Sequence, residues 1–320
     1  MMKAIQISGF GGPEVLKLLD IPVPEPGPGQ VRVCVKAAGV NPVDTYWRLG
    51  ANPTLPLPLT PGLDGAGLVD SLGLGVPEFA VGDRVYFGGW LTGAYAEMAV
   101  LRASQLHALP EGVTFQQGAA LHVPYATAHR ALFHRAGARA GDLILIHGAS
   151  GGVGLAATQF ASAAGMTVIG TAGTARGRQL VEAQGAQYVL DHTEPNYLDR
   201  IPGLTRGRGV DVVLEMLANV NLGKDLPLLS RGGRVIVIGS RGKVEITPRD
   251  AMMREADVRG LSLFNVADDD LRNIHAAIAS GLNSGIVKPV IRDELPLSEA
   301  SCAHTKVLEP GALGKILLSP

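Results

Sequence analysis

The hydrophobic and polar positions of this chain follow two patterns, and the change between them falls near residue 124. Before that point, short apolar runs are separated by turns rich in Pro, Gly and Asp, which is typical of strands. The first 123 residues are therefore predicted to be β-rich. The predicted strands are Lys3–Ile7, Val31–Ala37, Ala66–Leu72, Arg84–Tyr86 and Ala94–Val100.

Proline-dense segments interrupt this β-rich part. Residues 22–29 (PVPEPGPG) cannot continue a helix or occupy a central strand. Residues 51–62 (ANPTLPLPLTPG) are predicted to form a loop that is long enough to wall or cover a site. In the second predicted strand, the valines at 31, 33 and 35 share one face, whereas Cys34 lies on the other face beside Arg32 and Lys36. We expect Cys34 to be an ordinary thiol.

From residue 124 onward, helix and strand signals alternate. A predicted helix over 124–137 leads into apolar, β-branched strands of the kind found in a parallel sheet covered on both faces. The predicted strands are 143–147, 166–171, 187–192, 210–217 and 234–240, and the predicted helices between them are 155–165, 175–185 and 221–233. This alternation predicts a doubly wound α/β domain.

The last part of the chain suggests a return to the first domain. It contains a predicted helix around Asp268–Ser280 and a strand-like tail, KILLSP. We expect a β-rich domain at 1–123, a nucleotide-binding domain at 124–264, and a return segment at 265–320 that completes the first domain. The cleft between two such domains is the natural place for a ligand.

A glycine-dense turn at 143–154 (LILIHGASGGVG) indicates what the second domain binds. A short apolar strand runs into the turn and a helix follows it, which is the opening of a dinucleotide-binding unit. Small residues around Ala149 and Gly151 allow a sharp turn and a close approach to a pyrophosphate, and Gly154 lets the helix pack closely on the strand. The free N–H groups at the start of the helix would face the phosphate oxygens.

Composition and charge narrow the class of protein. No run among the 320 residues approaches the ~20 apolar residues of a membrane span. The amino terminus lacks the apolar segment of a secretory signal, so we expect a cytoplasmic location. A net charge of −1 gives no electrostatic reason to expect nucleic acid or an anionic membrane as a partner. The two cysteines, Cys34 and Cys302, are too few for a disulfide framework or a four-thiolate zinc site.

The choice of dinucleotide rests on the residues after the second strand. An NAD-binding fold carries an acid ~20 residues past the first motif glycine, where it holds the ribose hydroxyls. Residues 169–173 (IGTAG) contain no acid, and Arg176 and Arg178 stand close by instead. Arginines in a first helical turn oppose the helix dipole unless a phosphate lies there. We therefore expect NADPH, and the sequence leaves open which arginine meets the 2′-phosphate.

Several stretches together identify a family. They include AAGVNPVDTY (37–46), HGASGGVGLAATQ (147–159), EMLANVNL within 215–222, VIGSRG (237–242) and GALGKILL (311–318). Over essentially its whole length the chain resembles the zinc-free quinone oxidoreductases of the medium-chain dehydrogenase/reductase superfamily, in particular the zeta-crystallin branch. The resemblance implies a GroES-like β domain beside a Rossmann domain, NADPH as cofactor, reduction of quinones, and a homodimer or homotetramer.

The resemblance also implies which residues contact NADPH. Ser150, Gly151, Gly152 and Val153 would meet the pyrophosphate, and Gly173 and His192 would lie near the adenosine ribose and its 2′-phosphate. Many relatives carry a lysine near position 177, where this chain has Gly177 between Arg176 and Arg178. The remaining predicted contacts are Tyr46 and Thr127, Asn221, Ile238, Gly239, Ser240 and Arg241 along the cofactor, and Leu261, Ser262 and Leu263 at its nicotinamide end.

No catalytic metal is expected. The zinc alcohol dehydrogenases of the superfamily carry a cysteine after Gly-Val and a Gly-His-Glu, whereas this chain has Asn41 and Gly62-Leu63-Asp64 at those places. No two histidines have the helical i, i+4 ligand spacing. Without metal, the reaction needs a hydrogen-bond donor aimed at the oxygen that becomes negative. Asn41 and Tyr46 are the candidate catalytic donors, and Tyr125 and Thr127 are weaker ones.

Two other functions stay open at this point. The same scaffold could reduce the C=C bond of an enal or enone, a reaction that also needs a proton donor, for which Tyr46 is suited. The crystallin resemblance also leaves open a mainly structural or RNA-binding protein that holds NADPH, although no basic patch in the sequence supports it.

Overall fold

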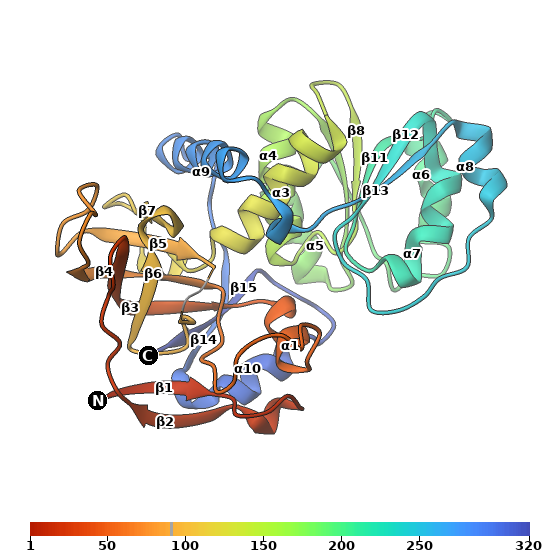
Figure 1. The fold of residues 1–320 in the computed structure, drawn as a ribbon. Helices are drawn as coiled ribbons and strands as arrows, with labels where there is room; N and C mark the ends of the chain where they lie inside the picture. The colour runs from red at the N-terminus through yellow and green to blue at the C-terminus, as the bar shows by residue number, and fades with distance from the viewer. Residues whose placement is uncertain (90–91) are drawn as a thin grey trace. The chain divides into compact units, whose positions relative to one another are not determined.

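The change of hydrophobic pattern at residue 124 coincides with a boundary in the fold. The structure is a computed structural model that describes residues 1–89 and 92–320 (Figure 1). The chain forms two units, of which the first contains residues 1–123, 289–310 and 314–320 and the second contains residues 124–288 and 311–313. The sequence suggested a return near residue 265, whereas in the structure the helix that follows belongs to the second unit and the chain rejoins the first at Pro289.

The first unit is built on a seven-stranded sheet and a separate two-stranded ribbon. The ribbon pairs β1 (Met2–Gln6) with β2 (Lys17–Ile21) in antiparallel fashion. The large sheet has the order β14-β15-β3-β4-β5-β7, with β6 paired to β3. Its strands are β3 (Gln30–Val40), β4 (Asp64–Leu72), β5 (Arg84–Gly88), β6 (Met98–Arg102), β7 (Leu106–Ala108), β14 (Ile291–Pro296) and β15 (Lys315–Ser319).

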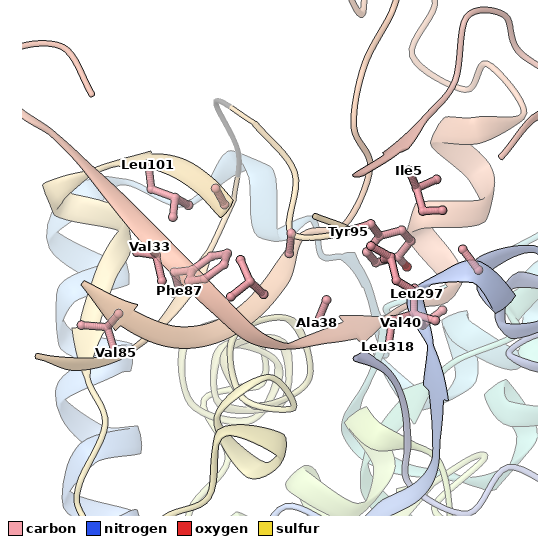
Figure 2. Packing of buried hydrophobic residues seen from close by; sticks show 14 of the residues in the cluster. Ile5, Val33, Ala38, Val40, Val85, Phe87, Tyr95, Leu101, Leu297 and Leu318 are labelled. Atoms are coloured by element: carbon pink, nitrogen blue, oxygen red, sulfur yellow. The ribbon is translucent and has the colours of Figure 1, made fainter. Parts of the chain in front are cut away.

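The core of this unit follows from the alternation predicted for β3. Val31, Val33 and Val35 are buried, whereas Cys34 on the opposite face is partly exposed and is a free thiol, as predicted. Figure 2 shows Val33 beside Phe87 and Leu101 at one end of the core, and Val40 beside Leu297 and Leu318 at the other. The carboxyl-terminal segment therefore contributes directly to the core of the first unit.

Three α-helices join these strands: α1 (Pro42–Arg48), α2 (Phe115–Gly118) and α10 (Ala300–Lys306). The sequence analysis did not predict α1. Its start carries a recognisable signal, since Asn41 is the N-cap, Pro42 stands at the first helical position, and the carboxylate of Asp44 accepts a hydrogen bond from the backbone N–H of Asn41 at 2.8 Å. Short 3-10 turns occupy Pro13–Val15, Ala103–Gln105 and Leu297–Glu299.

The second unit confirms the predicted doubly wound domain. Six parallel strands lie in the order β10-β9-β8-β11-β12-β13. They are β8 (Leu143–Ile146), β9 (Thr167–Thr171), β10 (Tyr188–Leu190), β11 (Val210–Glu215), β12 (Leu229–Val237) and β13 (Asp257–Gly260). The helical segment His122–Ala126 spans the boundary between the two units and continues into α3 (Thr127–His129) and Arg130–Ala136. The other helices of the second unit are α4 (Gly152–Ala163), α5 (Ala175–Ala183), α6 (Ile201–Leu204), α7 (Ala218–Asp225), α8 (Pro248–Arg254) and α9 (Asp268–Asn283), with 3-10 turns at Tyr197–Arg200, Leu226–Leu228 and Leu263–Asn265.

Some boundaries differ from the prediction, and each difference has a local cause. The helix predicted over 221–233 is α7 followed by a short turn, and β12 already begins at Leu229, because its pairing with β11 shifts register and so accommodates the glycines at 232 and 233. The edge strand β13 is largely exposed and has no apolar run, so its sequence carries no strand signal. Among the described residues, no helix is long and apolar enough to cross a bilayer.

The packing of α4 on β8 predicts that replacing Gly154 by alanine destabilises the protein, whereas the same change at an exposed glycine does not. A Cβ added at Gly154 would lie 2.5 Å from the Cα of Ala149 and 2.5 Å from the carbonyl oxygen of Gly148, both backbone atoms that cannot move aside cheaply. Gly154→Ala is expected to destabilise the second unit by ~1–3 kcal/mol. The measurement is thermal unfolding followed by circular dichroism.

Gly203 in α6 provides the matched control. It is exposed, and an added Cβ there meets nothing within 4 Å. Gly203→Ala should leave stability unchanged or raise it by up to ~1 kcal/mol, because alanine favours helix. Equal unfolding temperatures for the two variants would contradict the close approach at Gly154.

Candidate cofactor and substrate site

The predicted cofactor residues of the second unit gather at one edge of its sheet. Ligands of open α/β sheets bind at the carboxyl ends of the strands. Apart from Thr127, which lies in α3, every predicted contact in this unit follows such an end. Ser150, Gly151, Gly152 and Val153 follow β8; Gly173, Arg176 and Arg178 follow β9; His192 follows β10; Asn221 follows β11; Ile238, Gly239, Ser240 and Arg241 follow β12; Leu261, Ser262 and Leu263 follow β13.

The glycine turn after β8 has the geometry of a phosphate-binding loop. The N–H of Ala149 donates to the carbonyl oxygen of Thr171 at 2.8 Å, which ties the turn to the neighbouring strand. Gly151 is the N-cap of α4, so the N–H groups of the first helical turn point toward this edge and lack helical acceptors. An anion such as a pyrophosphate satisfies such groups and is favoured by the helix dipole. The turn therefore fits a dinucleotide.

The residues on the adenosine side show how the two predicted arginines differ. Thr174 caps α5 by accepting a hydrogen bond from the N–H of Gly177 at 3.0 Å. Arg178 forms an ion pair with Asp191, just past β10. Arg176 in the first turn is exposed and has no ion-pair partner within the described part of the chain. Arg176 is thus the arginine whose charge is uncompensated.

A buried group of three ionisable residues lies below this edge. His147 follows β8, Glu215 ends the adjacent strand β11, and Asp225 ends α7. The Nε2 of His147 lies 2.8 Å from Asp225 Oδ1 and 3.5 Å from Glu215 Oε2. The other Glu215 oxygen accepts from the N–H of Leu217 and from Asn221 Nδ2, the latter at 3.2 Å. Glu215 therefore positions Asn221, one of the predicted cofactor residues.

Two members of this group, Glu215 and His147, have raised pKa values. Burial raises the pKa of Glu215 to about 7. Burial opposes the charged form of His147, but the hydrogen bond and charge of Asp225, together with the charge of Glu215, outweigh it and raise the pKa of His147. Glu215 Oε2 and Asp225 Oδ2 are buried without a hydrogen-bond partner among the described residues. The folded protein therefore retains protons here that the unfolded chain would release.

In the first unit, Asn41 belongs to a second buried polar cluster. Lys315 Nζ lies 2.7 Å from Asp64 Oδ2 and also donates to Asn41 Oδ1. Asn41 Nδ2 donates to Asp64 Oδ2 at 3.0 Å, and the N–H of Val123 donates to Asp64 Oδ1 at 2.9 Å. The side chains of Asn41, Asp64 and Lys315 are at most 4% exposed.

The cluster extends along α1, the helix that carries Tyr46. Burial raises the pKa of Asp44 to about 7, although the N–H of Asn41 donates to it. The hydroxyl of Tyr95 lies 3.4 Å from Asp44 Oδ2 and 3.1 Å from the Nε2 of His304. These contacts hold α1 rigidly against the core of the first unit, and Tyr46 is half-buried on this helix.

The proline-dense loop at 51–62 lines a small hollow beside α1; that this loop walls a functional site stays a prediction. Its lining is largely apolar: Ile7, Trp47, Leu55, Leu59, Pro61, Gly62 and Leu63, together with Asp44 and Arg48. Its volume of about 20 Å³ is room for about one water molecule, so the hollow in this structure is too small for a quinone.

Comparison with known proteins gives a match for each of the two units. Residues 27–111 match the family model of the alcohol dehydrogenase GroES-like domain, and residues 152–280 match that of the zinc-binding dehydrogenases. The chain is 50% identical to the quinone oxidoreductase of Rattus norvegicus and 48% identical to that of Homo sapiens, covering 99% of this chain and 98% of each relative. The chain belongs to the quinone oxidoreductase family of the medium-chain dehydrogenase/reductase superfamily.

Solved structures support the same assignment. The quinone oxidoreductase of Escherichia coli complexed with NADPH is 30% identical, with a TM-score of 0.89 over 99% of this chain and all of that one. A mycobacterial protein complexed with NADPH is 32% identical, with a TM-score of 0.92 over 100% of both chains. The predicted family and the predicted combination of a GroES-like and a Rossmann domain are confirmed, and the protein is an oxidoreductase.

The residues at the positions where the superfamily's alcohol dehydrogenases carry zinc ligands do not fit a zinc ion. Leu63 has no ligand atom, and the oxygens of Asn41 and Asp64 both accept from the Lys315 ammonium. A dication placed at these oxygens would lie against that buried positive charge, and the repulsion is strong where water is excluded. No step of the chemistry is therefore assigned to zinc.

Sequence reasoning missed Lys315 and the group of His147, Glu215 and Asp225. A signal was present in each case. His147 and Glu215 end apolar strands that are neighbours in a doubly wound sheet, and such strand ends face a ligand crevice. Lys315 opens the strand that the analysis did predict, but only the three-dimensional pairing shows which carboxylate it meets.

The buried group of His147, Glu215 and Asp225 predicts that the stability of the second unit depends on pH. The folded state raises the pKa of both Glu215 and His147, so the stability that their bound protons contribute is present at low pH and is lost as pH rises. For Glu215 this loss falls at a pH of about 7. Glu215→Gln keeps the shape and removes one titrating group. Its unfolding temperature should fall less than that of the wild type between pH 5 and pH 8, by roughly a few degrees.

Glu182→Gln on α5 is the matched control, since Glu182 is an exposed acid on the same unit. This variant should reproduce the pH dependence of the wild type in differential scanning calorimetry. A Glu215→Gln curve that follows the wild type across this pH range would show that Glu215 does not hold an extra proton.

Proposed function

We propose that this protein is an NADPH-dependent quinone reductase that works without zinc. The observation that carries the proposal is similarity over nearly the whole chain to proteins named quinone oxidoreductase, at 48–50% identity. The edge of the Rossmann sheet supplies a phosphate-binding turn, and the first unit supplies helix α1, which carries Tyr46 and has Asn41 as its N-cap.

The reaction balances with one hydride and one proton. Bound NADPH supplies the hydride, the quinone accepts it together with a proton, and the products are NADP⁺ and a hydroquinone. A quinone is already a good electron acceptor, so positioning and exclusion of water account for much of the rate. Asn41 and Tyr46 donate hydrogen bonds to the oxygen that becomes negative. This chemistry needs no metal to polarise the acceptor.

Arg176 is the residue that we infer to bind the 2′-phosphate. Its charge is uncompensated in the first turn of α5, whereas Arg178 is already paired with Asp191. A phosphate at this place satisfies both the arginine and the positive end of the helix dipole. A side chain at Gly177 would meet the Thr174 hydroxyl at 2.9 Å and Ser150 Oγ at 3.3 Å, so the glycine preserves the N-cap of α5.

We also propose that the protein is a cytoplasmic homodimer or homotetramer. Both cysteines are free, as is usual in a reducing compartment. The edge strand β13 leaves one side of the Rossmann sheet unpaired, and Met252, Met253 and Val258 beside it are 47–63% exposed. Unpaired edges with exposed apolar residues favour pairing with a second copy of the chain.

Cofactor preference tests the assignment of Arg176. NADPH should bind more tightly than NADH, and Arg176→Ala combined with Arg178→Ala should weaken NADPH binding about ten- to hundredfold, which is the loss of one charge-assisted contact worth ~1.5–3 kcal/mol. NADH binding should hardly change. Fluorescence titration gives both dissociation constants.

The single variants show which of the two arginines binds the 2′-phosphate. Arg176→Ala alone should account for most of the loss, and Arg139→Ala, which lies before β8 at the opposite end of the strands, should have no effect. Equal dissociation constants for NADPH and NADH in the wild type would refute the preference. A loss confined to Arg178→Ala would reassign the phosphate to that arginine.

The reaction class is tested by Tyr46→Phe, which removes a hydroxyl and little volume. With an ortho-quinone we expect kcat to fall less than about threefold, because protons reach the product from water and the acceptor is reactive. With a 2-enal the carbanion must be protonated in place, so any turnover should fall about a hundredfold. Steady-state NADPH oxidation by wild type and variant on both substrates gives the result.

Wild-type turnover of the quinone well above that of the enal supports the proposal. The reverse order would make the protein an alkenal reductase on the same scaffold. Absence of NADPH oxidation with every quinone and enal would leave only a binding role for the cofactor and would refute the proposed enzyme activity.

A further inference from the structure

The register of three neighbouring strands brings a lysine to the candidate catalytic amide. Strand β15 pairs with β3 so that Ile316 lies opposite Val40, and the next positions along the two antiparallel strands are Lys315 and Asn41. On the other side of β3, Asp64 in β4 lies opposite Gly39. The three polar side chains therefore converge at one end of β3, from parts of the chain up to 274 residues apart.

This cluster fixes which way the Asn41 amide faces. An ammonium group has donors only and an ionised carboxylate has acceptors only. Lys315 Nζ therefore requires the amide oxygen on its side, and Asp64 Oδ2, at 3.0 Å from Nδ2, requires the amide nitrogen on the other. A flipped amide would set Nδ2 against the ammonium and Oδ1 against the carboxylate. Asn41 thus has one orientation, with its NH₂ group held at a defined place.

Lys315 also changes the charge near that NH₂ group. Asp64 is fully buried, and without a cation its negative charge would oppose the oxyanion that the reaction forms. The ammonium at 2.7 Å cancels it. His122 interacts electrostatically with both Asp64 and Lys315, but burial lowers its pKa, so it adds no positive charge of its own at neutral pH.

We propose that Lys315 is a positioning residue for quinone reduction, which orients the Asn41 amide and neutralises Asp64 so that Asn41 Nδ2 donates to the developing quinone oxyanion. An amide nitrogen carries two hydrogens, and the described residues supply one acceptor for it, Asp64 Oδ2. The second hydrogen is the one assigned to the substrate. This inference rests on the proposed function and on Asn41 as a donor.

The test is a double-mutant cycle between Lys315 and Asn41. Lys315→Met removes the ammonium and keeps most of the length, and Asn41→Ala removes the amide. Each is expected to lower kcat for an ortho-quinone about tenfold or more, with the NADPH dissociation constant unchanged. If Lys315 acts through Asn41, the double variant should lose no more than either single one. Multiplying losses would overturn the inference.

A second variant guards against failure to fold, because Lys315→Met leaves Asp64 buried and unpaired. Lys315→Met with Asp64→Asn removes both charges together, and replacing a whole buried pair is usually tolerated far better than breaking it. This variant should fold, bind NADPH normally and retain the kcat loss, since a neutral amide at 64 no longer fixes the orientation of Asn41. Wild-type kcat in this folded variant would overturn the inference.

The outcomes separate this inference from the proposed function. Lys306→Met on α10 is the control and should have wild-type kcat. A kcat loss in Asn41→Ala but none in Lys315→Met refutes only the role of Lys315. No loss in Asn41→Ala refutes Asn41 as a donor and this inference with it. Absence of quinone turnover in the wild type refutes the proposed function itself.

Discussion

The first unit depends on the burial of one carboxylate. Asp64 is fully buried in β4, and removing a carboxylate from water costs several kcal/mol unless cations and donors replace the water. The replacements are the ammonium of Lys315, the N–H of Val123 and the side-chain amide of Asn41. Because Lys315 opens the last strand of the chain, the charge of Asp64 is compensated only when that strand returns to the sheet. The return of the carboxyl-terminal segment to the first unit is thus an electrostatic requirement as well as a matter of apolar packing.

In the second unit, buried carboxylates are also compensated, but by bound protons instead of a lysine. His147 and Glu215 lie at the carboxyl ends of the two central strands, β8 and β11, where the strand order reverses and the helices diverge. A crevice there is suited to a ligand, but it also leaves buried polar groups beneath the ligand. Burial raises the pKa of Glu215, and the hydrogen bond and charge of Asp225 raise the pKa of His147, so bound protons offset the buried negative charge. In return, Glu215 binds the N–H of Leu217 and the amide of Asn221, which shapes the loop after β11.

Sequence alone predicted those parts of the fold that local pattern determines. The valines of β3, the glycine turn and the alternation after residue 124 each carry their own signal, and the structure agrees with all three. Pattern could not assign α9 to a unit, because an amphipathic helix shows that it has a buried face but not what buries it. The strand β13 escaped prediction because it is short and largely exposed. The hydrogen bond between Lys315 and Asn41 was not predicted, because the two residues are 274 positions apart and neither local sequence indicates how their strands are aligned.

If Asn41 is the donor that we propose, the buried cluster around it shows how the orientation of that donor is fixed without a metal. A metal fixes its ligands through coordination geometry, whereas an amide between apolar neighbours could rotate and present either its oxygen or its nitrogen. Between a group that only donates and a group that only accepts, rotation would create two unfavourable contacts and lose two favourable ones, each costly in a site without water. The pairing of opposite charges across Asn41 therefore specifies orientation as well as position. An acceptor that is already reactive, such as a quinone, needs little more than this from the protein.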